Sequence, residues 1–283
     1  MELVKGQRAI ITGGGTGLGF ASAKTLIEHG AHVLIAGRRA DVLELAANEL
    51  EKFAVGGTIA THQCDVTEES QVEAAMAAAA GPSGRIDIVI ANAGGAFPAP
   101  ITSLDPAGWR FALDLNVIGT ALTIKHAVPA MKENGGSIIT MSSTAGVKVE
   151  RWMAAYSVSK AAVEMLTKCA AFELSQFKIR VNGIRPGWHS TESNLQYCPP
   201  EFQEDVIGKT FLGRAGEPDD IGNAVLWLAS PLASFVTGHI LGVDGGLGVD
   251  VGEDFEGMVR MLMGDGMMDA ALGRTDVDSA PVA

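Results

Sequence analysis

The stretch Arg8-Ala-Ile-Ile-Thr12-Gly13-Gly-Gly-Thr-Gly17-Leu-Gly19-Phe20-Ala-Ser-Ala-Lys-Thr-Leu-Ile27 decides the fold of this chain. It begins with a short apolar run typical of a strand and ends with the periodicity of a helix. The glycines between them permit positive φ and close backbone approach, and a helix that begins here offers free N–H groups to a pyrophosphate. The pattern therefore predicts a dinucleotide-binding turn, although it departs from the strict Gly-x-Gly-x-x-Gly spacing. A glycine-rich turn without a ligand is the alternative.

Apolar runs and helical patterns alternate along the rest of the chain. Helices are expected at 43–53, 69–80 and 218–229, and a long helix is expected to begin near Pro106. Strands are expected in seven places, at 8–12, 32–36, 58–64, 86–90, 137–142, 178–185 and 239–243. Such alternation predicts an α/β fold with helices on both faces of the sheet. We expect a single Rossmann-like, doubly wound domain with a seven-stranded, mostly parallel sheet.

Composition excludes several classes of protein. The chain has 283 residues, of which 47% are hydrophobic and 19% charged, as in a globular protein. It has no apolar run long enough to span a membrane, and its first residues lack a secretory pattern, so we expect a cytoplasmic protein without a membrane partner. The net charge of −12 argues against a nucleic-acid partner. Cys64, Cys169 and Cys198 lack the spacing of a metal site, so no metal is expected.

The chain is expected to divide near residue 248. Residues 1–248 would form the dinucleotide-binding and catalytic domain, and 249–283 an acidic, Met-rich extension. Eight acidic residues follow residue 248, against two arginines. Helical spacing predicts a short amphipathic helix from Phe255, Met258, Val259 and Leu262. We expect this helix to dock on a subunit, and a frayed acidic appendage is the alternative.

Tyr156 and Lys160 are four residues apart in a helix-forming sequence, so their side chains share one face. An unperturbed phenol has a pKa of about 10, and a nearby ammonium lowers it. The pair is therefore a candidate proton donor and acceptor near neutral pH. A Tyr and a Lys four residues apart can also occur by chance, and the two side chains would then only pack against each other on the surface. Ser143, thirteen residues before Tyr156 at the end of a predicted strand, favours the catalytic interpretation.

Over residues 5–248 the chain resembles the short-chain dehydrogenase/reductase family. The signatures that match are Thr12-Gly13-x-x-x-Gly17-x-Gly19, Asn92-Ala93-Gly94, Asn116, Ser143, Tyr156-x-x-x-Lys160 and Pro186-Gly187 with Thr191. Several independent motifs in the same order make coincidence implausible. The resemblance implies hydride transfer between a nicotinamide cofactor and a secondary alcohol or ketone.

The resemblance also implies a four-member catalytic set. Asn116 would hold a water in a proton relay, and Ser143 would orient the substrate oxygen. Tyr156 would be the general acid or base, while Lys160 would lower its pKa and hold the nicotinamide ribose. Ser142 is expected to be a bystander.

The end of the second strand bears on the choice of cofactor. An acid there binds the ribose diol of NAD, whereas an arginine accommodates the phosphate of NADP. Gly37 stands where the acid would be and Arg38 follows, so NADP(H) is favoured. NAD(H) remains possible if the arginines are only solvated. The residues expected around the cofactor are Thr12, Gly13, Thr16, Gly17, Leu18, Gly19, Arg38, Arg39, Asp65, Val66, Asn92, Ala93, Gly94, Tyr156, Lys160, Pro186, Gly187, His189 and Thr191.

A substrate lid is expected at about 188–212, because residues 192–212 lack strong periodicity. The side chains expected around the substrate are Phe97, Ser143, Val149, Trp152, Trp188 and Leu195. They favour a moderately bulky, apolar compound such as a steroid, terpene or aryl ketone, although they could equally be packing residues. His189 is expected to act through its backbone, with a second acid–base group as the alternative.

Three alternative functions remain. A reductase of 3-oxoacyl thioesters on a carrier protein would need a basic docking patch, but Arg110, Lys125 and Lys132 are well spaced and the chain is acidic. A lyase or epimerase of the same fold would usually carry a different glycine spacing and a larger C-terminal domain. A noncatalytic NAD(P)-binding module would be expected to have lost part of the catalytic set. The family resemblance also implies a homotetramer or homodimer.

Overall fold

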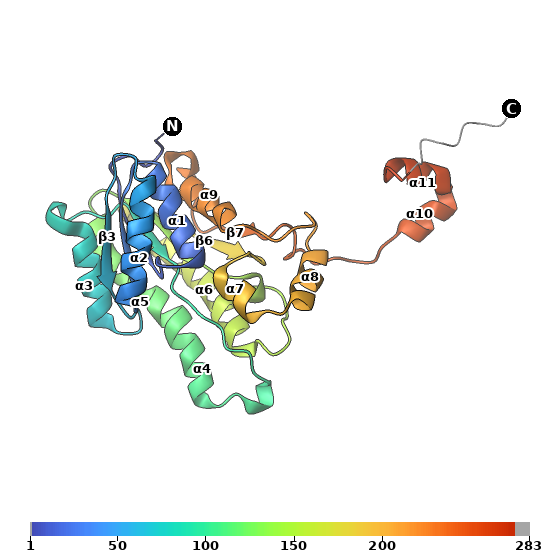
Figure 1. The fold of residues 1–283 in the computed structure, drawn as a ribbon, viewed down its shortest axis with the longest axis horizontal. Coiled ribbons are helices and arrows are strands. Elements are labelled where there is room, and N and C mark those ends of the chain that lie inside the picture. Colours follow the sequence, from blue (N-terminus) through green and yellow to red (C-terminus); the bar gives the residue numbers. More distant parts are fainter. Residues whose placement is uncertain (1, 275–283) are drawn as a thin grey trace. The chain divides into compact units, whose positions relative to one another are not determined.

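The computed structural model describes residues 2–274, and within them seven strands form one sheet (Figure 1). The strand order is β3-β2-β1-β4-β5-β6-β7, and every neighbouring pair is parallel. The predicted doubly wound α/β fold is therefore confirmed, with a sheet that is parallel throughout. The strands are β1 Arg8–Thr12, β2 His32–Gly37, β3 Ile59–Gln63, β4 Ile88–Ala91, β5 Gly136–Met141, β6 Ile179–Pro186 and β7 Ile240–Val243.

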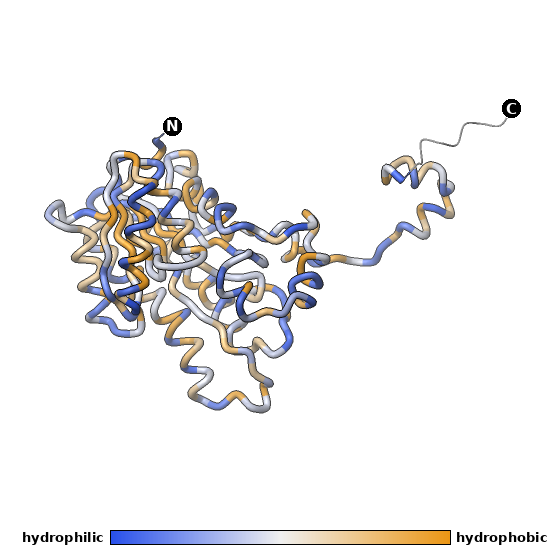
Figure 2. The backbone as a smooth tube through the Cα atoms, viewed as in Figure 1, coloured by the Kyte–Doolittle hydropathy of each residue, from blue (hydrophilic) through white to orange (hydrophobic). Residues whose placement is uncertain are grey.

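Helices cover both faces of the sheet. Successive strand residues point to opposite faces, so the fully buried Ile10 and Ile11 belong to two different core clusters. One cluster contains α1 Gly17–Glu28, α2 Ala40–Leu50 and α9 Pro218–Ala229. The other contains α3 Glu69–Ala80, α5 Gly119–Met131 and α6 Ala154–Leu174. Figure 2 shows the hydrophobic residues concentrated along the central strands. None of the helices within residues 2–274 is long and apolar enough to cross a membrane.

The order of the strands reverses at the boundary between β1 and β4. From β1 the chain runs outward to β2 and β3, then crosses to β4 on the other side of β1. In open α/β sheets a ligand binds outside the carboxyl ends of the strands at such a reversal. The fold therefore places the ends of β1 and β4, at Thr12 and Ala91, beside the expected cofactor crevice.

The long helix predicted to begin near Pro106 contains an irregular turn. α4, Pro106–Leu113, starts at Asp105, whose side chain accepts a hydrogen bond of 2.8 Å from the backbone N–H of Gly108. The residues between α4 and α5, Asp114–Ile118, form a π-helical turn. Single π turns inside α-helices are frequent at functional sites, and Asn116 lies in the middle of this one.

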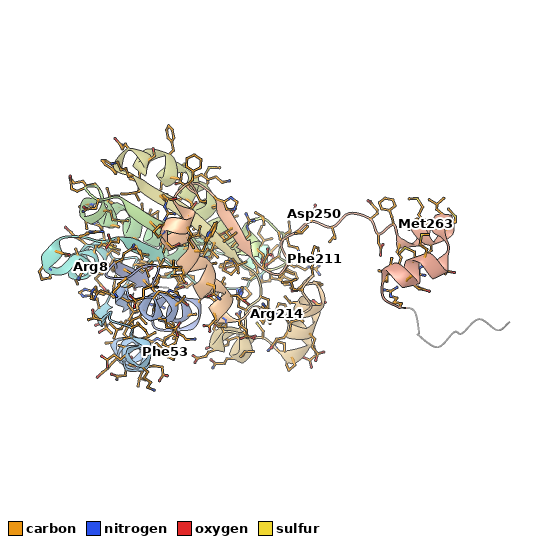
Figure 3. All side chains as sticks on the ribbon, turned by 90° about the horizontal axis from the view of Figure 1, so that it is seen from above. Arg8, Phe53, Phe211, Arg214, Asp250 and Met263 are labelled. Atoms are coloured by element: carbon orange, nitrogen blue, oxygen red, sulfur yellow. The ribbon has the colours of Figure 1, made fainter. Side chains whose placement is uncertain are left out.

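The prediction that residues 192–212 are irregular is wrong. They contain α7, Glu192–Tyr197, and α8, Pro200–Gly208. The Thr191 hydroxyl accepts a hydrogen bond from the backbone N–H of Asn194 and so caps α7. Pro200 occupies the first position of α8, where its missing N–H costs nothing. Figure 3 labels Phe211 and Arg214, which follow α8 along the chain.

A second compact unit begins at Val249. It contains α10, Glu256–Met263, and α11, Asp265–Ala271. Arg260 of α10 pairs with Glu256 of the same helix at 2.8 Å and with Asp269 of α11 at 2.9 Å, and the second pair joins the two helices. Figure 3 labels Met263 at the end of α10. Met1, which belongs to the predicted domain of residues 1–248, lies outside the described residues. Residues 275–283, which belong to the predicted extension, also lie outside them.

Candidate active site

The ends of β1 and β4 are joined by hydrogen bonds around Thr12. The Thr12 hydroxyl accepts from the backbone N–H groups of Asn92 and Ala93, both at 3.1 Å. The Asn92 amide donates to the carbonyl oxygens of Thr12 and Gly13, at 3.0 and 3.2 Å. The glycine turn and the Asn92-Ala93-Gly94 motif, which lie far apart in sequence, therefore form one rigid edge of the expected cofactor crevice.

The glycine turn lets neighbouring backbone segments pack closely. A Cβ on Gly19 would lie 2.2 Å from the carbonyl oxygen of Gly13, and Gly13 itself has φ of +67°. α1 begins directly after this turn, with no acidic side chain in its first turn and no side-chain cap from Thr16. Its free N–H groups and helix dipole fit a pyrophosphate. A Cβ on Gly17 would lie 3.6 Å from the Thr191 side chain, so the turn also meets the predicted nicotinamide loop.

Arg38 and Asp65 lie close together beyond the ends of β2 and β3. The Gln63 side chain donates to the Arg38 carbonyl oxygen at 2.9 Å. Burial acts to raise the pKa of Asp65, but hydrogen bonds from Thr67 and the charge of Arg38 outweigh it, and the pKa is lowered overall. Val66, the neighbour of Asp65, is buried. The structure thus brings together three of the residues predicted at the adenosine end of the crevice.

Asn116 is fully buried, and three hydrogen bonds fix its side chain. Its Oδ1 accepts from the Gly95 N–H, and its Nδ2 donates to the Gly95 carbonyl and to the Ser159 hydroxyl, each at 2.9 Å. A Cβ on Gly94 would lie 2.8 Å from Asn116 Oδ1 and 3.2 Å from Lys160 Nζ. The π-helical turn therefore places Asn116 against both the β4 loop and the catalytic helix. Ser159 was not predicted, and only its position beside Lys160 could have signalled it.

Lys160 is a buried ammonium within reach of Tyr156. Its residue is 5% exposed, and Nζ donates to the Met141 carbonyl oxygen at 2.9 Å. Nζ also lies 5.6 Å from the centroid of the Tyr156 ring. Burial lowers the pKa of Lys160 to about 8. α6 thus brings the predicted pair onto one face, as its spacing requires.

The pKa of Tyr156 differs from the sequence-based expectation. Burial raises it, a hydrogen bond with the Ser143 hydroxyl lowers it, and the charge of Glu150 raises it. The predicted lowering by Lys160 is therefore wrong for this structure, because desolvation of the phenolate dominates. At neutral pH Tyr156 is a protonated phenol next to Ser143, which suits it to donate a proton.

A partly buried ion pair behind the catalytic residues was not predicted from the sequence. Arg185 donates to Glu164 through Nε and one terminal nitrogen, both at 2.8 Å. The Ser142 hydroxyl donates to Glu164 at 2.9 Å, and its place outside the catalytic set stays a prediction. Glu164 follows Lys160 by one turn of α6. The sequence did carry a signal for this ion pair, because an acidic residue four places after a catalytic lysine lies on the same face of the helix.

His189 is buried and packs away from the catalytic set. It is 2% exposed, and its Nδ1 lies 3.2 Å from the Gly187 carbonyl oxygen. A Cβ on Gly216 would lie 2.6 Å from the ring, so the imidazole rests on that backbone. Burial lowers the pKa of His189. None of the hydrogen bonds of its ring within residues 2–274 involves Ser143 or Tyr156.

The residues predicted around the substrate are mostly exposed apolar side chains. Phe97, Val149, Trp152 and Leu195 all expose large parts of their surface, while Trp188 packs against Phe202 with ring centroids 5.4 Å apart. The Trp152 carbonyl oxygen accepts from the Ala99 N–H at 2.8 Å. This bond joins the loop that carries Phe97 to the turn before α6. The structure therefore brings the segments that carry Phe97 and Trp152 together, whereas Leu195 lies on α7, where its N–H donates to the Thr191 carbonyl at 2.9 Å.

A nucleotide crevice beside a Ser, Tyr, Lys and Asn set defines a nicotinamide-dependent oxidoreductase. A family model described as "Enoyl-(Acyl carrier protein) reductase" matches residues 13–248. The chain belongs to the short-chain dehydrogenase/reductase family, which confirms the resemblance seen in the sequence. It is an NAD(P)-dependent enzyme that acts on CH–OH groups or the corresponding ketones.

Several relatives are known as dehydrogenases of cyclic alcohols. The chain is 38% identical to 7alpha-hydroxysteroid dehydrogenase of Escherichia coli, over 85% of this chain and 94% of the relative. It is also 38% identical to cis-4-hydroxycyclohexanecarboxylate dehydrogenase of Sinomonas cyclohexanicum, over 84% and 95%.

Solved structures show the same fold. A short-chain type dehydrogenase/reductase from Mycobacterium ulcerans superposes with a TM-score of 0.84, at 39% identity over 93% of this chain and 97% of the other. A 7 alpha-hydroxysteroid dehydrogenase complexed with NADH and 7-oxo glycochenodeoxycholic acid gives a TM-score of 0.82, at 37% identity over 87% and 95%.

Proposed function

We propose that the substrate is a secondary alcohol or ketone on a moderately bulky, apolar skeleton of the steroid, terpene or aryl type. The observation that carries this proposal is the group of exposed apolar side chains on the segments around Tyr156, including Phe97, Val149 and Trp152. Burial of such side chains against an apolar ligand is favourable by about 25 cal/mol per Å². The names of the relatives, a hydroxysteroid and a hydroxycyclohexanecarboxylate dehydrogenase, support the same class.

The proposed roles of the catalytic residues follow from their contacts. Ser143 and Tyr156 hydrogen-bond the carbonyl oxygen of the ketone, and Tyr156 releases its proton to that oxygen. The nicotinamide supplies or accepts the hydride when bound. Lys160 places a positive charge near the phenol, and Asn116 fixes the β4 loop through its bonds to Gly95.

The pH dependence of the two directions should be opposite. The raised pKa of Tyr156 keeps the phenol protonated at neutral pH, which favours ketone reduction. Alcohol oxidation needs the phenolate, so its rate should increase as pH rises toward the pKa of Tyr156.

We propose a preference for NADP(H) over NAD(H), on the evidence of Arg38. Its charge reaches Asp65 at the adenosine end of the crevice, and Gly37 leaves the position of the ribose-binding acid without a carboxylate. In the relative with a solved complex the cofactor is NADH. The ratio of kcat/KM for the two cofactors, in the parent and in Arg38→Ala, tests the preference. Loss of the NADP preference in the variant supports it, and an unchanged ratio rules it out.

We also propose a homotetramer or homodimer. Exposed apolar side chains lie on α4, on the π-helical turn that follows it and on α6, including Phe111, Ile118, Val158, Met165 and Phe172. Patches of this kind on soluble proteins mark association surfaces. Sedimentation of the parent and of Phe172→Glu is the test, because Phe172 is 84% exposed in one chain. A monomeric parent would exclude the proposal.

The experiment for the substrate class follows the absorbance of the reduced nicotinamide during turnover. A panel of cyclic secondary alcohols, cyclic ketones and acetoacetyl thioesters is offered with both cofactors. Turnover of the cyclic ketones, lost in Tyr156→Phe, supports the proposal. Preferential turnover of the thioesters would replace it with carrier-protein chemistry. Cofactor binding without turnover of any compound would favour a noncatalytic module.

A further inference from the structure

Glu164 of the catalytic helix α6 accepts hydrogen bonds from the ends of two neighbouring strands. The Ser142 hydroxyl, directly after β5, donates to its Oε1 at 2.9 Å. Arg185, near the end of β6, donates to both carboxylate oxygens at 2.8 Å. The two donors are neighbours, since the Ser142 N–H also donates to the Ile184 carbonyl at 2.7 Å. Glu164 is only 7% exposed, so a single buried carboxylate joins α6 to β5 and to β6.

Three successive residues at the end of β5 are each bonded to a different turn of α6. Their partners follow one another at intervals of four residues, so they share one face of the helix. The outer two contacts involve the proposed catalytic residues, and the contact of Glu164 lies between them along β5. The bonded pairs are Met141 with Lys160, Ser142 with Glu164, and Ser143 with Tyr156.

Arg185 extends the same network toward the loop predicted at the nicotinamide. Gly187 of that loop follows Arg185 by two residues, and its N–H donates to the Val243 carbonyl at 3.1 Å. A Cβ on Gly187 would lie 2.8 Å from the Cα of Asp244, so the loop packs closely against the end of β7. A guanidinium that bonds both carboxylate oxygens is fixed in direction as well as in distance. Glu164 therefore holds the start of this loop from the side of α6.

The chemistry of this network suits support of a site better than stability alone. Taking two charges out of water costs about as much as their attraction returns, and apolar residues of similar volume often pack equally well. A hydrogen-bonded network does, however, fix the directions of its members. Catalytic groups need such support, because a displacement of about 1 Å can reduce a rate by about 10²-fold.

We propose that Glu164 is a positioning residue for hydride and proton transfer. Its bond with Ser142, the β5 contact, holds Ser143 against Tyr156. Its ion pair with Arg185, the β6 contact, holds the predicted nicotinamide loop beside the catalytic helix. The inference rests on the proposed roles of Ser143 and Tyr156, and it gives Glu164 itself no contact with substrate or cofactor.

The kinetic test separates the two contacts. Ser142→Ala removes the β5 contact and keeps the ion pair, so kcat for ketone reduction should fall by at least about tenfold. The cofactor Kd of this variant should stay within about threefold of the parent value. Arg185→Gln replaces the β6 contact by at most one neutral bond, and its cofactor Kd should rise by at least about fivefold. Glu164→Gln weakens both contacts, so both quantities should change.

Two control variants separate positioning from charge and from stability. Glu173→Gln removes an exposed acid on the same helix. Met131→Ala leaves a cavity beside Gly136, at the opposite end of β5 from Ser142, and so lowers stability without touching the network. Both controls should keep kcat and cofactor Kd within about twofold of the parent values, measured where every variant is folded.

A spectroscopic test needs no turnover. The chain has two tyrosines, so in a Tyr197→Phe background the alkaline absorbance change of tyrosinate reports Tyr156 alone. The hydrogen bond with Ser143 lowers the pKa of Tyr156. Ser142→Ala changes no charge, so if it loosens Ser143 the titration midpoint should move to higher pH, and Glu173→Gln should leave it in place. The groups that act on the pKa of Tyr156 are the Ser143 hydroxyl, the Lys160 ammonium and the Glu150 charge.

The outcomes separate this inference from the proposed function. If Tyr156→Phe abolishes turnover but Ser142→Ala and Glu164→Gln keep the parent kcat, the inference is overturned and the proposed function stands. An unshifted tyrosine titration in Ser142→Ala also overturns it. If Glu164→Gln does not fold, Ser142→Ala decides, because its ion pair is intact. If the parent turns over no ketone, the proposed function fails, and the titration with the cofactor Kd of Arg185→Gln decides the inference by itself.

Discussion

Replacing Lys160 by methionine should stabilise the protein while abolishing its activity. Lys160 is buried, its ammonium has one hydrogen bond to the part of the chain that the structure describes, and burial lowers its pKa from 10.5 to about 8. Each pKa unit corresponds to about 1.4 kcal/mol, so the charged form costs about 3 kcal/mol in the folded state. Loss of the bond to the Met141 carbonyl offsets about 1 kcal/mol. The net gain expected for Lys160→Met is about 2 kcal/mol near neutral pH.

The pH dependence of this gain has a definite sign. The folded-state pKa lies below the unfolded value, so between about 8 and 10.5 the unfolded chain binds more protons than the folded one. Stability of the parent, relative to the variant, should therefore rise with pH across that window. Below about pH 8 the cost of burying the charged Lys160 is fully present, so the difference in free energy of unfolding between variant and parent is largest there.

Denaturant unfolding near pH 7 and near pH 10 measures the effect. Lys168→Met is the matched control, because Lys168 is an exposed lysine on the same helix. The control should change stability by less than about 0.5 kcal/mol at either pH. A Lys160→Met variant that is less stable than the parent near pH 7, or a gap that does not shrink at high pH, would refute the reasoning.

Three further predictions follow from contacts in the site. Gly19→Ala places a methyl carbon 2.2 Å from the Gly13 carbonyl oxygen, so the glycine turn must shift. The Kd of the cofactor, measured by fluorescence titration, should rise by at least about tenfold. An unchanged Kd would contradict the placing of the pyrophosphate at this turn. Glu164→Ala removes both hydrogen bonds that Arg185 donates to Glu164 and leaves Asp244 as its acidic neighbour. Because the pair is only partly buried, the free energy of unfolding should fall by about 2 kcal/mol. A loss below about 0.5 kcal/mol in denaturant unfolding would show that the pair is unimportant. In pH–rate profiles, alcohol oxidation should increase with pH as Tyr156 loses its proton, and a flat profile with chemistry rate-limiting would contradict its role.

The parallel sheet could be predicted from the sequence because its strands are buried on both faces. Ile10 and Ile11, in the middle of β1, are both fully buried, as the continuous apolar run predicts. Such runs can be recognised without knowing their neighbours. The order of the strands was not predicted, because periodicity identifies a strand but not its neighbours.

The details that the sequence missed depend on three-dimensional contacts. The π-helical turn at Asp114–Ile118 has no periodicity of its own, because it inserts a single wider turn into a helix. The pKa of Tyr156 depends on how deeply α6 is buried, which spacing along a helix cannot give. α7 and α8 did carry signals, a capping threonine and a first-turn proline, but their short length hides any period. Docking of the extension from Val249 onward stays a prediction.

The measurement that tests the central claim most directly compares the parent, Tyr156→Phe and Ser143→Ala on one cyclic ketone. Ketone reduction is followed by the loss of reduced-nicotinamide absorbance, and cofactor binding by fluorescence titration of the same samples. If Tyr156 donates the proton, the phenylalanine variant should lose about 10²–10⁴-fold in kcat while its cofactor Kd stays within about threefold. A Tyr156→Phe enzyme that keeps most of the parent kcat would contradict the account.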